Sequence, residues 1–279
     1  MRIAYYCTEI NAKTMKKLTG IVLGLFLGTA LMAQDGAGNE QNFRFGLNAM
    51  PSINFYKPAD IKRFESNGAV MKFAWGLSLD FKLGGTAWLS TGLHVAYDGG
   101  KIGFKDTVVS FIKDNEFSTP DAFVQGAGVG FTQTRVEERK YSATYVTLPL
   151  NIKMKTKEIG YLNYYGLFGV SAGIKVKSRV DEDGKLFGTN NAASNDAMDN
   201  SKDMGFFRAG VNIGGGAEWN LSGTTSLTFG LQYNMGFTNV VKKDSEYLYK
   251  YSSTPTPAFT SLNQKFSSSY FGLVVGVLF

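Results

Sequence analysis

The sequence contains little cysteine, histidine or proline: one, one and six residues respectively among 279. The single cysteine, Cys7, precedes an apolar run and would be removed with it, so the mature chain would have no thiol. This excludes a disulfide framework, a cysteine nucleophile and a lipoprotein, because no cysteine follows the apolar run to carry a lipid. The 33 glycines and 14% aromatic residues, with so few prolines, favour long twisted strands over helices.

The body of the chain also lacks a large excess of positive charge. The formal net charge is +6, but residues 1–33 carry +3 of it, which leaves +3 for all the other residues. No basic stripe remains that could follow a phosphate backbone, so we expect no nucleic-acid partner.

The start of the chain has the pattern of a secretory signal peptide. Lys16 and Lys17 precede an apolar stretch over residues 18–32, which ends at Ala33. The stretch is shorter than the roughly 20 residues of a membrane-spanning helix and is interrupted by glycines, so a membrane anchor is disfavoured. Residues 1–14 fit no part of a signal peptide. Met15 is therefore the more natural start, and residues 1–33 are predicted to be cleaved.

After residue 41 the dominant pattern is strict alternation of apolar and polar residues. In the first such segment Phe43, Phe45 and Leu47 alternate with Arg44 and Gly46. Strands that cross an outer membrane have this period and need about 9–11 residues each. The pattern recurs in eight segments: residues 43–55, 72–83, 89–97, 146–155, 162–176, 207–221, 227–237 and 271–279.

A soluble β-sandwich also alternates, but it would not repeatedly place lysine, arginine and glutamate on an enclosed face. In a membrane barrel the apolar face meets lipid and the polar face fills the interior. We therefore expect an all-β fold, a closed antiparallel transmembrane β-barrel of about eight strands. It would cover residues 43–279, after a short periplasmic lead over residues 34–42.

The predicted connections alternate between short and long, as periplasmic turns and external loops do in such barrels. The short ones are Gly84–Thr86, Lys157–Gly160 and Ser222–Thr225, and the long polar ones are Tyr56–Ala69, Asp98–Ser142, Ser178–Gly205 and Asn239–Gln264. This assignment places aromatic residues in two belts at the membrane interfaces. The outer belt would hold Phe55, Trp75, Tyr97, Phe207 and Phe237, and the inner belt Phe43, Phe81, Tyr164, Trp219 and Phe279.

Two stretches carry a resemblance to a known family. Tyr145–Lys155 reads YVTLPLNIKMK, and after a short turn residues 161–176 read YLNYYGLFGVSAGIKV. These resemble the paired central strands of PorT-like outer-membrane barrels, and the motifs also fit OmpA- or OmpX-type small barrels. The ending FGLVVGVLF, with the terminal Phe279, is similar to the insertion signal read by the barrel-assembly machinery. The resemblance covers about Phe43–Phe279. It implies an outer-membrane location and, for the founding member, a part in type IX protein secretion.

The charged residues on the inward face predict a filled interior. Asp80 and Glu218 face inward and could form an acid/base pair, but an ion-pair network with inward-facing cations is the plainer interpretation. An eight-stranded barrel is only wide enough for its side chains to fill. The residues predicted to fill it are Arg44, Lys72, Asp80, Lys82, His94, Arg208, Glu218 and Gln232.

No chemical motif in the sequence is complete. His94 lacks the His-x-Ser partner of barrel deacylases, because residue 96 is alanine, so we interpret it as a hydrogen-bonded interior residue. Residues 126–130 are glycine-rich without the Lys-Ser/Thr of a phosphate loop. Residues 214–216 are three glycines that suit close packing. Residues 181–184, Asp-Glu-Asp-Gly, lack calcium-ligand spacing. We expect no catalytic, cofactor or metal site.

We therefore expect a non-enzymatic outer-membrane barrel with a structural or interaction role, including support of protein secretion or surface assembly. The alternatives are a small-solute pore and, third, a surface hydrolase acting on lipid or peptide. The expected partners are outer-membrane lipid and lipopolysaccharide, the barrel-assembly machinery through the strand ending at Phe279, and secretion-system or extracellular proteins at the loops.

Overall fold

The computed structural model describes residues 42–126, 128–253 and 258–279. The predicted signal peptide and the lead up to residue 41 lie outside the described residues. The described elements are β1 (Phe43–Pro58), β2 (Phe64–Ser66), β3 (Val70–Gly84), β4 (Ala87–Lys113), β5 (Glu116–Ser118), α2 (Pro120–Gln125), β6 (Phe131–Lys155), β7 (Leu162–Leu186), β8 (Ala192–Asp199), β9 (Phe207–Ser222), β10 (Thr225–Gly236), β11 (Asp244–Ser252), β12 (Ala258–Asn263) and β13 (Phe266–Leu278).

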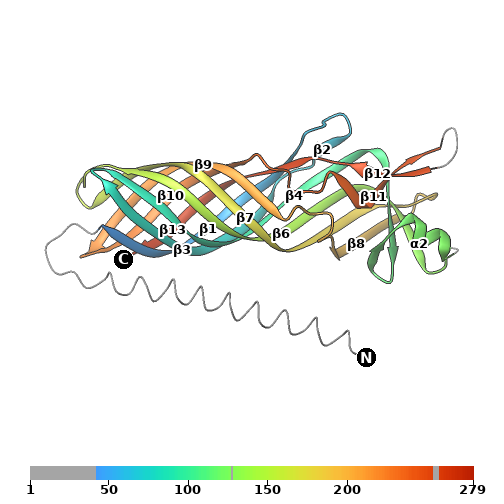
Figure 1. Ribbon diagram of the computed structural model, residues 1–279, viewed down its shortest axis with the longest axis horizontal. Coiled ribbons are helices and arrows are strands. Elements are labelled where there is room, and N and C mark those ends of the chain that lie inside the picture. Colours follow the sequence, from blue (N-terminus) through green and yellow to red (C-terminus); the bar gives the residue numbers. More distant parts are fainter. Residues whose placement is uncertain (1–41, 127, 254–257) are drawn as a thin grey trace, which may run out of the picture. The chain divides into compact units, whose positions relative to one another are not determined.

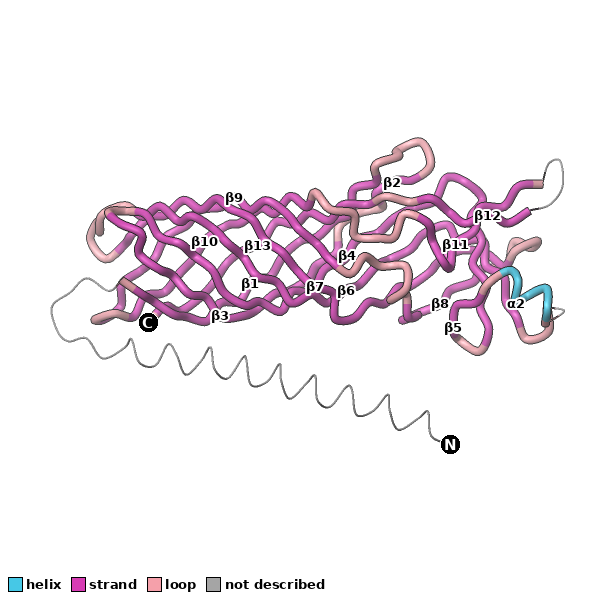
Figure 2. The backbone as a smooth tube through the Cα atoms, in the orientation of Figure 1, coloured by secondary structure: helices cyan, strands magenta, loops and turns pink. Residues whose placement is uncertain are grey.

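All thirteen strands belong to one antiparallel sheet, as the all-β prediction requires. Its long strands are neighbours in the order β4-β3-β1-β13-β10-β9-β7-β6, and β6 also pairs with β4. Each of the eight predicted segments falls on one of these strands to within one residue. Figures 1 and 2 show the long strands side by side around a common interior, with the short strands and α2 gathered beyond one end.

The two faces of these strands have inverted polarity. On β3, Phe73, Trp75 and Phe81 are 42%, 50% and 37% exposed, whereas the intervening Asp80 is 1% exposed. The same inversion holds on β1, where Phe45 and Leu47 are exposed and Arg44 is buried. A water-soluble protein buries most of its large apolar side chains. An apolar outer face with a polar interior instead suits a protein surrounded by lipid.

The predicted short turns are confirmed, and several of the predicted interface aromatic residues are exposed. The three short connections occur where predicted, and Gly160 and Gly223 adopt left-handed conformations with φ of 68° and 56°, which glycine adopts without strain. Trp75, Tyr97 and Trp219 are exposed on the outer face. Their position at membrane interfaces stays a prediction. In the described part of the chain, no helix has the length and apolar character needed to cross a membrane.

The prediction of four long loops is wrong, because these segments are largely strand. They contain the outer halves of β4, β6 and β7, together with β2, β5, β8, β11, β12 and α2. β4 has 27 residues and β6 and β7 have 25 each, more than twice the roughly 9–11 residues that cross a membrane. We call the part formed by residues 56–69, 98–142, 178–205 and 239–264 the extension.

The extension has a hydrophobic core of its own. Its fully buried side chains include Tyr56, Ile102, Tyr141 and Leu248. Several charged residues lie on the solvent-facing sides of these strands and pair between neighbouring strands, as in Lys101–Glu138 at 3.1 Å and Lys140–Asp181 at 3.0 Å. These surface charges made the segments resemble loops in the sequence.

Candidate functional site

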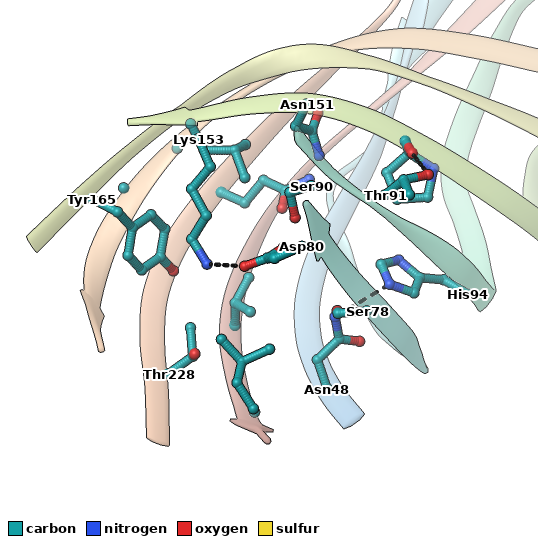
Figure 3. Close-up of a pocket in the computed structure, with 18 of the residues that line it drawn as sticks. Asn48, Ser78, Asp80, Ser90, Thr91, His94, Asn151, Lys153, Tyr165 and Thr228 are labelled. Atoms are coloured by element: carbon teal, nitrogen blue, oxygen red, sulfur yellow. Dashed lines mark hydrogen bonds and ion pairs between the residues drawn. The ribbon is translucent and has the colours of Figure 1, made fainter. Parts of the chain in front are cut away.

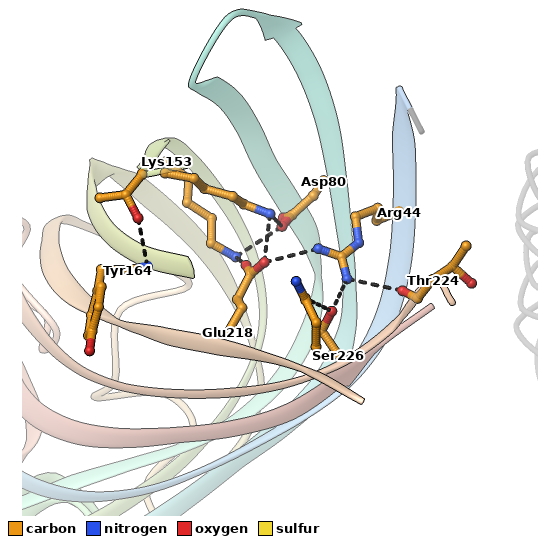
Figure 4. A network of polar contacts seen from close by, with 10 residues as sticks. Arg44, Asp80, Lys153, Tyr164, Glu218, Thr224 and Ser226 are labelled. Atoms are coloured by element: carbon orange, nitrogen blue, oxygen red, sulfur yellow. Dashed lines mark hydrogen bonds and ion pairs between the residues drawn. The ribbon is translucent and has the colours of Figure 1, made fainter. Parts of the chain in front are cut away.

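A cluster of buried charges joins the barrel strands near the short turns (Figure 4). Glu218 on β9 lies at its centre. Arg44 Nη1 donates to Glu218 Oε2 at 3.0 Å and Lys155 Nζ donates to the same oxygen at 2.9 Å, while Lys153 forms an ion pair with Oε1. All four side chains are at most 11% exposed.

Asp80 on β3 completes this barrel cluster, which we define as Arg44, Asp80, Lys153, Lys155 and Glu218. Lys153 Nζ lies 3.0 Å from Asp80 Oδ2 and Lys155 Nζ lies 3.7 Å from it. Three cations therefore share two carboxylates in a space shielded from water, where opposite charges attract strongly. The cluster cross-links β1, β3, β6 and β9 through their side chains.

The predicted ion-pair network exists, but its membership differs from the prediction. Arg44, Asp80 and Glu218 belong to it, whereas Arg208 and Lys72 do not: Arg208 pairs with Asp98, and Lys72 donates to Ser142 Oγ at 2.9 Å. The lysines that bind the carboxylates come from β6. They are two residues apart and therefore lie on the same, inward-facing side of the strand. This spacing does not show which carboxylate each lysine reaches.

His94 lies beside two small cavities in the barrel interior, one of which is drawn in Figure 3. Its Nε2 is 3.2 Å from Asn48 Nδ2, which agrees with the prediction of a hydrogen-bonded interior histidine. The cavities have volumes of about 60 and about 50 Å³, and His94, Pro149 and Asn151 line both. Each has room for a few water molecules.

A second buried ion pair joins the barrel to the extension. Arg208 Nη1 lies 2.8 Å from Asp98 Oδ2. The other oxygen of Asp98 accepts hydrogen bonds from Asn54 Nδ2 at 2.9 Å and from Ser268 Oγ at 2.8 Å. The guanidinium of Arg208 also lies over the ring of Tyr145, 4.8 Å from its centroid. We call Asp98 and Arg208 the junction pair.

A third set of buried charges lies inside the extension. Arg139 on β6 pairs with Glu182 on β7 and lies 3.7 Å from Asp203 Oδ2, and all three side chains are fully buried. Burial disfavours the charged guanidinium, but the attraction of Glu182 outweighs it and raises the pKa of Arg139. Asp203 also accepts from Ser245 Oγ at 2.5 Å. This cluster could not be predicted from the sequence, because all three residues fall in segments predicted to be loops.

Two of the incomplete motifs, residues 181–184 and 214–216, have structural explanations. Asp181 pairs with Lys140, and Asp183 Oδ1 accepts from Ser194 Oγ at 3.0 Å. At Gly216 an added Cβ would lie 2.0 Å from the carbonyl oxygen of Phe229, so close strand packing requires glycine there. Among the described residues, no three His, Cys, Asp or Glu side chains are grouped to hold a metal ion.

The chain resembles known proteins at two levels. The family model described as outer membrane protein beta-barrel domain matches residues 32–242. No curated protein matches the chain.

Several solved structures align with most of the chain at low identity. The outer membrane protein OprG from Pseudomonas aeruginosa is 11% identical, with 88% of this chain and 99% of that chain covered and a TM-score of 0.43. A major outer membrane protein from Thermus thermophilus is 14% identical, covering 86% and 99%, with a TM-score of 0.39. Neisserial surface protein A is 10% identical, covering 86% and 98%, with a TM-score of 0.37.

Proposed function

The chain belongs to the outer membrane protein beta-barrel domain family, and on this premise we propose that it is a closed, plugged, eight-stranded barrel that displays the extension at the cell surface. Its role is structural or interactive rather than enzymatic: the barrel holds the extension in place, and the extension meets partners outside the cell. Support of protein secretion or surface assembly falls within this role.

The single observation that carries the proposal is the filled interior. The barrel cluster ties four strands together across the interior with charges that are at most 11% exposed. The cavities beside His94 measure about 60 and about 50 Å³, far below the 300–1,000 Å³ typical of ligand sites. This arrangement favours a plug over a small-solute pore.

Closure of the barrel is supported by the pairing of its first and last long strands. β1 pairs with β13 from Gly46↔Leu278 to Pro58↔Phe266, and β4 pairs with β6. A closed barrel leaves no strand edge facing lipid, which a membrane-spanning sheet requires. The exposed apolar outer face would contact lipid and lipopolysaccharide.

The route to the membrane follows from the two ends of the chain. Residues 1–33 would direct export and be cleaved. The barrel-assembly machinery would read the strand that ends at Phe279, whose N–H donates to the carbonyl oxygen of Phe45 at 2.7 Å. The hydrolase alternative has little support, since Asp80 and Glu218 are both held by lysines.

Cysteine labelling of intact cells tests the orientation. Asn190→Cys places a thiol in the exposed connection between β7 and β8, and Lys157→Cys places one in the exposed short turn between β6 and β7. A membrane-impermeant maleimide should label the first variant in intact cells. It should label the second only after the outer membrane is permeabilised.

The parent chain is the control, because Cys7 is its only cysteine and lies in the segment predicted to be removed. Labelling of Lys157→Cys but not Asn190→Cys in intact cells would invert the orientation. Equal labelling of both variants in intact cells would contradict a membrane-spanning barrel.

A further inference from the structure

The extension contains a cleft that is much larger than the cavities of the barrel. It has a volume of about 760 Å³, within the usual size range of ligand sites. It lies between β5, β8 and the start of β11. Among the described residues, β5 pairs only with β4 and β8 pairs only with β7, so each has one unpaired edge. We call it the extension cleft. Its lining includes Glu116, Phe117, Asp196, Asp199, Lys202 and Tyr247.

An aromatic stack forms one wall of the extension cleft. The ring of Tyr247 stacks on that of Phe117, with centroids 4.7 Å apart and planes at 22°. The guanidinium of Arg139, fully buried, lies 5.0 Å from the centroid of Phe117. Phe117 therefore contacts both the ring of Tyr247 and the buried guanidinium of Arg139, which fixes the stack to the core.

The phenol of Tyr247 stays neutral at physiological pH. Partial burial and the carboxylate of Asp203 raise the pKa of Tyr247 to about 12. The ring is therefore a partly exposed, uncharged platform in a lining that otherwise consists mainly of polar side chains.

Two carboxylates beside this platform are free to accept hydrogen bonds from a ligand. No hydrogen bond or ion pair engages the side chain of Glu116 or Asp196 within the described part of the chain, whereas Asp199 already accepts hydrogen bonds from Ser201. Lys202 is the one cation in the lining. Free acceptors beside an aromatic face suit a ligand that has both hydroxyl groups and an apolar face.

The shape of β8 argues against an added peptide strand. Its pairing with β7 is interrupted by a bulge, and Ala197 adopts φ of 55° while its N–H donates to Asp181 Oδ1 at 2.9 Å. A bulged edge disrupts the regular ladder that β-addition needs. The excess of carboxylates over lysine also disfavours polyanions.

We propose that the extension cleft binds a neutral oligosaccharide, one sugar ring of which stacks on Tyr247 while its hydroxyls donate to Glu116, Asp196 and Asp199. A sugar ring offers a flat face of C–H groups and a rim of hydroxyls, which match the ring and the charged acceptors respectively. This inference names a ligand class for the extension and so rests on the proposed function.

A glycan array with the purified, folded full-length protein tests the inference. The probes are hexasaccharides of glucose, mannose, galactose and N-acetylglucosamine in several linkages, with heparin as the anionic comparison. At least one neutral probe should bind. Calorimetric titration of that probe should show affinity at least tenfold lower for Tyr247→Ala and for Asp196→Asn, and nearly unchanged for Tyr247→Phe.

Tyr161→Ala is the matched control, because Tyr161 is 72% exposed in a short turn of the barrel far from the cleft in the chain. It should bind like the wild type. The inference is overturned by binding of no neutral probe, by preference for heparin, or by equal losses in Tyr161→Ala and Tyr247→Ala. The glycan experiment uses purified protein and the labelling experiment uses intact cells. A failure to bind glycans therefore contradicts the sugar-binding inference without changing the labelling result that tests the proposed function.

Discussion

Arg208 on β9 and Asp98 on β4 form a fully enclosed ion pair, with Arg208 Nη1 2.8 Å from Asp98 Oδ2, at the level where the barrel continues into the extension. Asp98 marks the end of the predicted third strand and the start of a predicted loop. In the structure its carboxylate also accepts hydrogen bonds from Asn54 on β1 and Ser268 on β13. Buried charges thus fix the extension to the barrel.

Removal of the central carboxylate should destabilise the barrel. In Glu218→Ala, both lysines of the barrel cluster keep only Asp80 as an ion-pair partner, and Arg44 keeps only its hydrogen bonds to Thr224 and Ser226; an unpaired buried charge costs about 3–5 kcal/mol. Urea unfolding in lipid vesicles, followed by the gel mobility of the folded form, measures the loss. Glu158→Ala, in an exposed turn, is the control and should change little. Equal stability of Glu218→Ala and wild type would show that the cluster contributes nothing.

Close packing around Tyr165 makes a second prediction. A Cβ at Gly230 would lie 2.2 Å from the hydroxyl oxygen of Tyr165, so Gly230→Ala should cost about 1–3 kcal/mol through overpacking. Tyr165→Phe removes that oxygen and should recover part of the loss in the double variant. The same unfolding assay, run as a double-mutant cycle, gives the coupling. Additive effects of the two changes would contradict the packing.

Acid should release a contact at the surface of the extension. Lys250 Nζ and Arg63 Nε donate to Asp106 Oδ2 at 2.9 and 3.0 Å, and these bonds, that of Lys250 first, lower the pKa of Asp106 from 3.8. A lowered folded-state pKa stabilises the fold above pH 3.8, and this stabilisation is lost as pH falls through the folded-state value.

Hydrogen exchange of β2 and β11 should therefore be constant from neutral pH to about pH 4 after correction for intrinsic rates. Asp106→Asn should show faster exchange in these strands already at neutral pH. Unchanged exchange in this variant would mean that the contact does not hold the strands.

The terminal aromatic residue should matter for insertion. Phe279 is 40% exposed, and its ring lies 5.5 Å from that of Phe45 on the outer face. If the barrel-assembly machinery reads this residue, Phe279→Ser should lower the amount in the outer membrane and increase degradation in the periplasm. Phe271→Ser, on the same strand and face, is the comparison. If Phe279→Ser reached wild-type levels in the outer membrane, Phe279 would not be part of the insertion signal.

The barrel strands could be predicted because lipid imposes one simple rule on every residue that crosses it. Phe73, Trp75 and Leu77 face outward and Lys72, Ala74 and Gly76 inward, and a period of two needs no knowledge of the partner strand. The short turns follow from glycine for the same local reason. These features are properties of neighbouring residues in the chain.

The extension and the ion-pair partners could not be predicted in this way, since both depend on register between distant strands. In the sequence, Glu138 and Lys101 resemble loop residues. In the structure the pairing of β4 with β6 places Lys101 Nζ 3.1 Å from Glu138 Oε1. Likewise the alternation over residues 146–155 predicts that Lys153 faces inward, but only the strand register determines that it binds Asp80, a carboxylate that Lys72 could otherwise have bound.

The measurement that tests the plugged barrel most directly is conductance of the purified protein in planar lipid bilayers. The barrel cluster and the junction pair fill the interior, so we expect no steady open channel under applied voltage. A general diffusion porin reconstituted in the same lipid should conduct and confirm that insertion is detectable. Steady conductance of nanosiemens scale from this protein would contradict the plug and make it a pore.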